Sequence, residues 1–139
     1  MAKALRILLI LLSVCGAVVA SLALQAHYSN KVEPCDINAH WDCGVVNHSS
    51  FSMIHGVPVA AIGIAGYLLL GLLALLGKRG LTLVAALVGL CVALYFTHVE
   101  ASILQVWCLY CVISQGIIAL ITIFAAISLA CRPKQQSAP

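Results

Sequence analysis

Long apolar runs limit what this chain can fold into. A helix that crosses the hydrocarbon core of a bilayer needs about 20 apolar residues. Only 8% of the 139 residues are charged and 63% are hydrophobic, with a mean hydropathy of +1.12. This composition excludes an ordinary soluble domain and indicates an integral membrane protein. We therefore predict an all-α four-transmembrane-helix bundle that forms a single membrane domain over residues 1–139. Its four spans are expected at about 7–26, 56–77, 81–103 and 107–131.

The first run could be a cleaved signal peptide or a retained span. Lys3 and Arg6 precede it, as either interpretation requires. The apolar part of a signal peptide is usually 7–15 residues long and ends at a small-residue cleavage motif. This run is longer, and no clear A-x-A motif ends it, so we expect the span to be retained.

The polar segment 27–55 is expected to form a loop outside the membrane, with a short half-helix around 45–54. The cationic side chains sort to one side of the predicted spans, and only Lys31 falls on the loop side. The six on the other side are Lys3, Arg6, Lys78, Arg79, Arg132 and Lys134. The positive-inside rule then places both termini in the cytoplasm and the loop on the periplasmic or exterior side. Because the net charge of +3 is explained by this topology, we expect no nucleic-acid partner.

Two cysteine pairs lie on the outer side, where disulfides persist. Cys108 and Cys111 form a C-x-x-C motif at the head of the last run, and Cys35 and Cys43 lie in the loop. Helical spacing of three brings two sulfurs onto one face, close enough to bridge. A helix start also favours the thiolate, which is the species that attacks disulfides. The pattern predicts thiol–disulfide chemistry with electrons passing between the two pairs.

Two other interpretations stay open. Cys35, His40, Cys43 and His48 could bind a metal ion, although their spacing is irregular for a zinc module. The loop could also carry only a stabilising disulfide. Neither interpretation gives the C-x-x-C motif a role. The other cysteines are interpreted as small apolar packing residues; they are Cys15, Cys91 and Cys131.

The order of these motifs resembles that of bacterial homologues of the vitamin K epoxide reductase family, over nearly the whole chain. The residues that carry the resemblance are Cys35-x7-Cys43, Ser49, and Tyr95-x4-Glu100-x6-Trp107-Cys108-x-x-Cys111. The quinone-linked oxidase of the Dsb system also has two cysteine pairs, but its C-x-x-C comes first. The order in this chain argues against that family.

The resemblance implies a quinone-dependent thiol oxidoreductase in the bacterial inner membrane that drives disulfide formation. Electrons would come from a periplasmic thioredoxin-fold (DsbA-like) partner, which Cys35 would contact. Cys43 would exchange with Cys108, and Cys111 would face the quinone, of the ubiquinone, menaquinone or vitamin K type. Since the chain ends eight residues after Cys131, we expect the partner to be a separate protein.

Several further residues are candidates for the quinone site. Ser49 is implied by the resemblance, with Ser50 as an adjacent rival, and Gln115 and Val59 stand where vertebrate members have Tyr and Asn. An ionisable group near the end of a span is a functional candidate in its own right, which adds Glu100. The full set of predicted quinone contacts is Ser49, Ser50, His55, Glu100 and Gln115.

Overall fold

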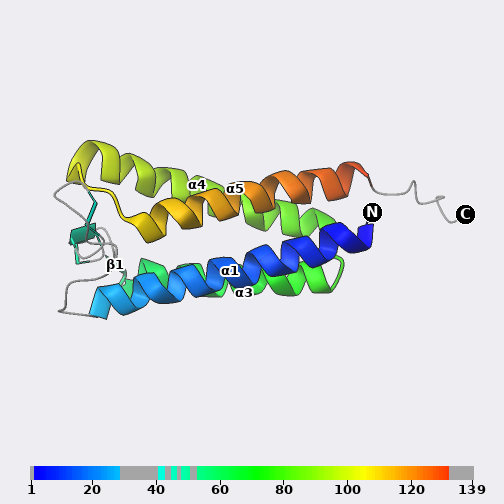
Figure 1. Cartoon of the computed structure of the whole chain (residues 1–139), viewed down its shortest axis with the longest axis horizontal. Coiled ribbons are helices and arrows are strands. Elements are labelled where there is room, and N and C mark those ends of the chain that lie inside the picture. Colours follow the sequence, from blue (N-terminus) through cyan, green and yellow to red (C-terminus); the bar gives the residue numbers. More distant parts are fainter. Residues whose placement is uncertain (1, 29–40, 43–44, 47, 51–52, 132–139) are drawn as a thin grey trace, which may run out of the picture.

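Four helices that lie side by side make up most of the protein (Figure 1). The structure is a computed structural model, and it describes residues 2–28, 41–42, 45–46, 48–50 and 53–131. The helices are α1 (Ala2–Tyr28), α3 (Val59–Leu75), α4 (Arg79–Val99) and α5 (Leu109–Ala130). Helix α1 packs against α3 and α5, and α5 packs against α4. The start of α1 and the end of α5 lie at the same end of the bundle (Figure 1).

Three of these helices are long and apolar enough to cross a membrane: α1, α5, and α4 together with the turn that follows it. The prediction of a predominantly helical membrane protein is therefore confirmed. Helix α3 is also apolar but has only 17 residues. At 1.5 Å per residue it extends about 26 Å, which is slightly less than the hydrocarbon core of about 30 Å.

Helix α3 begins later than its apolar run suggested because a short hairpin comes first. Strands β1 (Met53–Ile54) and β2 (Val57–Pro58) pair antiparallel. His55 and Gly56 between them have φ of 50° and 82°, the positive values that a tight two-residue hairpin turn requires. The end of the predicted half-helix at 45–54 is therefore a strand.

The connection from α4 to α5 changes its backbone geometry three times. A π-helical turn, η2 (Glu100–Leu104), continues α4, and Gln105 then adopts a left-handed conformation with φ of 54°. Cys108 is extended and forms the N-cap of α5. The last helix thus begins at Leu109, not at Trp107 as predicted, so Cys108 precedes the helix and Cys111 lies in its first turn.

The core consists of small and branched apolar side chains where the helices meet, while the outward faces carry large apolar side chains. The buried cluster is Leu9, Ala20, Tyr67, Leu70, Ala74, Ala86, Ile118, Ile121 and Ala125. Leu68 and Leu75, both 61% exposed, are typical of the outward faces. Lipid chains would cover such faces, and small interfacial residues allow the close packing on which helix association in membranes depends.

Tyr67 connects three of the helices. Its ring lies against Gly16 of α1, so closely that a Cβ at Gly16 would overlap it. Its hydroxyl donates to the Ser114 carbonyl oxygen of α5 at 2.8 Å and lies 2.7 Å from the Ser114 hydroxyl. The missing side chain at Gly16 therefore lets α1 approach α3 closely enough for Tyr67 to reach α5.

We expect Gly16→Ala to lower the stability of the folded protein by about 1–3 kcal/mol, the usual cost of adding a carbon to a packed site. Gly116→Ala in α5 is the matched control, because a Cβ added there would meet nothing within 4 Å. Alanine there gains helix propensity and is expected to be neutral or slightly stabilising. Thermal unfolding in one detergent, followed by circular dichroism, measures both. Equal melting temperatures for the two variants would contradict the packing of Tyr67 on Gly16.

Candidate functional site

A cavity of about 440 Å³ lies between the four helices, toward the end of the bundle where α5 begins. Its walls are mainly apolar side chains from α1, α3, α4 and α5. The polar groups among them are few, and they are Ser49, Tyr67, Thr97, Glu100, Tyr110, Cys111 and Ser114. An apolar slot of this size with a few polar groups is the usual form of a site for a small organic molecule.

The two cysteines of the C-x-x-C motif differ in their access to this cavity. Cys111 lines it, whereas Cys108 does not line it and is fully buried. Their side chains are in hydrogen-bonding contact with each other. A molecule in the cavity would thus meet Cys111 first, with Cys108 directly behind it.

Glu100 binds both cysteines from the end of α4. Its Oε2 accepts the Cys108 N–H at 3.2 Å, and its carboxyl group is also hydrogen-bonded to the Cys111 side chain. Only 3% of Glu100 is exposed. The carboxylate stands at the N-terminus of α5, where the helix dipole favours negative charge. The arrangement places a proton acceptor against the cysteine that lines the cavity.

Several described residues between α1 and α3 lie against the C-x-x-C segment. The Asp42 N–H donates to the Trp107 carbonyl oxygen at 3.0 Å, and the rings of Trp41 and Trp107 lie 6.4 Å apart between centroids. Val46 packs against Cys108. Residues on both sides of positions 43–44 therefore contact Trp107 or the buried Cys108.

The loop cysteines themselves, Cys35 and Cys43, lie outside the residues that the structure describes. The same holds for His40, so three of the four ligands of the metal-binding interpretation are outside the described part. Within the described ranges, no group of three or more metal-ligating side chains is present.

The predicted quinone contacts divide into two groups. Ser49 and Glu100 line the cavity. Ser50 is exposed in the loop, and His55 is exposed at the turn of the hairpin. Gln115 is hydrogen-bonded to Thr97 between α4 and α5 and does not line the cavity.

Sequence reasoning missed Tyr67 and Ser114, the polar pair on the cavity wall. They are 47 residues apart in the chain, so no local spacing connects them. The available signal was a tyrosine in the middle of an apolar run, because a buried tyrosine hydroxyl usually has a hydrogen-bond partner.

Comparison with known proteins adds one match. The model of the vitamin K epoxide reductase family matches residues 7–126. No curated protein matches the chain.

We expect the reduced protein to react faster with a small alkylating agent at Cys111 than at Cys108, because only Cys111 lines the cavity and a fully buried thiol is inert. Time-resolved peptide mass spectrometry in detergent distinguishes the two sites. Denaturation in dodecyl sulfate should make the rates equal. Faster alkylation of Cys108 in the folded protein would contradict the arrangement described here.

Proposed function

This chain belongs to the vitamin K epoxide reductase family and is therefore a membrane thiol oxidoreductase; on that premise, we propose that it oxidises the thiols of a soluble partner and passes the electrons to a quinone. The observation that carries the proposal is the position of Cys111. It lines an apolar cavity, with Cys108 and Glu100 both in contact with it.

The cavity suits a quinone ring. Its volume of about 440 Å³ lies within the range of about 300–1,000 Å³ usual for small-ligand sites. Apolar side chains such as Leu70, Val88 and Phe96 line it. The Ser49 and Tyr67 hydroxyls add polar groups to its wall, each donating to a backbone carbonyl oxygen, of Val46 and of Ser114. A quinone supplies an acceptor for two electrons and two protons. Ubiquinone, menaquinone and vitamin K types all share this chemistry.

The step at the cavity oxidises the C-x-x-C pair. The thiols of Cys108 and Cys111 lose two protons and two electrons as a disulfide bond forms between them. Both electrons and, overall, two protons go to the quinone, which leaves as the quinol. Glu100 accepts the proton of the Cys111 thiol, because its carboxyl group is already hydrogen-bonded to that side chain. Removing this proton makes the thiolate, the reactive form of cysteine.

The step toward the partner is thiol–disulfide exchange. The Cys43 thiolate attacks the Cys108 sulfur, which breaks the Cys108–Cys111 bond and releases Cys111 as a thiol. Cys35 then attacks Cys43, releasing Cys108 and forming the loop disulfide, which in turn oxidises two thiols of the partner. The support for this route is that Asp42 and Val46, on either side of Cys43 in the sequence, contact Trp107 and Cys108.

The partner in this scheme is a separate thioredoxin-fold protein of the periplasm. We place the chain in the bacterial inner membrane with four spans, of which α3 is the shortest, and with both termini in the cytoplasm. The distribution of charge supports this orientation, since Arg6 and Arg79 lie at the opposite end of the bundle from Cys108. The loop and the cysteines then face the periplasm.

We expect the purified protein to reduce a soluble quinone analogue anaerobically when a reduced thioredoxin-fold protein is the electron donor. Cys108→Ala and Cys111→Ala should each abolish reduction, because neither can form the disulfide. Cys43→Ala should stop transfer from the partner but leave oxidation of chemically reduced Cys108 and Cys111. The control is Cys91→Ala, an exposed residue of α4 outside the cavity, with unchanged activity expected. Quinone reduction at the normal rate by Cys111→Ala would refute the proposal.

Glu100→Gln should slow quinone reduction by about 100-fold, within the range for a positioned proton acceptor. Glutamine keeps an oxygen for the Cys108 N–H but cannot accept a proton. Raising the pH should recover part of the rate, because solvent hydroxide then removes the thiol proton. Asp42→Asn is the matched control: it keeps the acceptor for the Val45 N–H, lies off the cavity, and should react normally. An unchanged rate or an unchanged pH profile in Glu100→Gln would contradict this role.

A further inference from the structure

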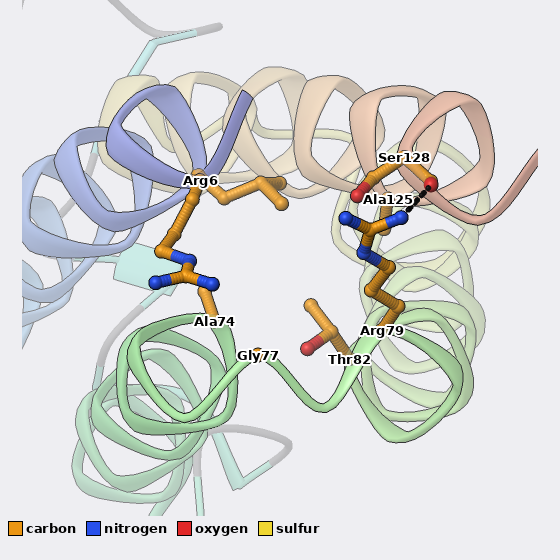
Figure 2. A pocket seen from close by; sticks show the side chains of 8 residues that line it. Arg6, Ala74, Gly77, Arg79, Thr82, Ala125 and Ser128 are labelled. Carbon is orange, nitrogen blue, oxygen red and sulfur yellow. Dashed lines mark hydrogen bonds between the residues drawn. The ribbon is translucent and has the colours of Figure 1, made fainter. Parts of the chain in front are cut away.

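A second polar site lies at the end of the bundle opposite the cysteines, in a small hollow between the helix ends (Figure 2). Its lining comes from all four helices and from the turn between α3 and α4. The residues are Arg6, Leu9, Ala74, Gly77, Arg79, Thr82, Ala125 and Ser128. The hollow measures about 20 Å³, enough for one or two oxygen atoms but not for a whole molecule.

Two guanidinium groups lie around this hollow, and no carboxylate of the described residues lines it. Arg79 donates from Nη1 to the Ser128 carbonyl oxygen at 3.2 Å, which leaves its other donors available. Within the described ranges, Arg6 makes no hydrogen bond or ion pair. The two acids of those ranges, Asp42 and Glu100, both contact the Trp107–Cys108 segment at the other end. Two like charges around one hollow repel each other, and an anion between them would remove that repulsion.

The hollow lies at the depth of lipid headgroups if the helices cross a bilayer. Helix α4 begins at Arg79 and has 21 residues, so it extends about 31 Å, close to the thickness of the hydrocarbon core. Apolar side chains surround the charged residues on the outside of the bundle. Ile7, Leu75 and Leu76 are 51%, 61% and 60% exposed. A cationic hollow bordered by apolar surface matches a ligand with a negative head and hydrocarbon chains.

We propose that Arg6 and Arg79 bind the phosphate of an anionic phospholipid headgroup from the leaflet opposite the cysteine site. Guanidinium groups bind phosphate oxygens through paired N–H donors, and the Ser128 hydroxyl lines the same space. The acyl chains extend along Ile7, Leu75 and Leu76. The bound phosphate connects α1 with α4, a helix pair that is not among the closely packed ones. This site is independent of the redox function proposed above.

The test is lipid retention, measured by native mass spectrometry after incubation of the purified protein with dioleoylphosphatidylglycerol or dioleoylphosphatidylcholine. We expect preferential retention of phosphatidylglycerol and a rise in melting temperature with that lipid. Arg6→Gln should weaken retention about fivefold, the usual effect of one cation at a membrane surface. Since Arg6 has no polar partner in the described ranges, the variant should fold normally in phosphatidylcholine. Arg79→Lys, which keeps the charge but loses the paired donors, should retain less phosphatidylglycerol than the parent protein.

The matched control is Lys3→Gln, which removes one positive charge from the same end but does not line the hollow. Its retention of phosphatidylglycerol should equal that of the parent protein. Equal weakening in Lys3→Gln and Arg6→Gln would show diffuse attraction and overturn the proposal. Inorganic phosphate is the second arm: if it raises the melting temperature as much as phosphatidylglycerol does, the hollow binds a free anion and the lipid assignment is wrong.

Discussion

The cysteine site depends on the hydrogen bonds that the Glu100 carboxylate makes. A buried charged or polar group is costly unless hydrogen bonds replace its water. Glu100 obtains those bonds from the Cys108 N–H and the Cys111 side chain. They hold the end of α4 against the start of α5. Cys108 is the N-cap of α5, and its side chain makes no capping hydrogen bond. Glu100 instead supplies an acceptor from another helix for the Cys108 N–H. The π-helical turn that begins at Glu100 belongs to the same arrangement, since such turns frequently mark functional sites.

The two cysteines differ in their access to the cavity. Cys111 lies on the wall of the apolar cavity, where a molecule bound in the cavity would contact it. Val46 packs against Cys108. The Asp42 N–H donates a hydrogen bond to the Trp107 carbonyl oxygen, which holds this part of the loop next to Cys108. One cysteine is therefore accessible from the cavity, and the other contacts the loop. The relay proposed above would need this separation, because its two proposed reaction partners differ in solubility and cannot occupy the same position.

In the described part of the chain, the two ends of the bundle carry side chains of opposite charge. The cysteine end contains the buried carboxylate, and the far end contains Arg6 and Arg79 around one hollow. This asymmetry supports the orientation proposed above, and it leaves the arginines without acidic partners in the described part of the chain. Tyr67 lies between the two ends and holds α1, α3 and α5 together beside the cavity.

Hydropathy and motif order by themselves predicted the helical membrane class, the family and the C-x-x-C motif at the head of the last helix, because these depend on residues close together in the sequence. The contacts that shape the cavity could not be predicted in this way. Tyr67 and Ser114 are 47 residues apart, and only helix packing brings them together. Packing also directs Gln115 toward Thr97 and leaves His55 on an exposed turn. Helix α3 starts late because a hairpin precedes it. The left-handed turn residues of that hairpin cannot be predicted from an apolar run. Local pattern thus determined which segments become helices, whereas tertiary packing decided which side chains share the cavity.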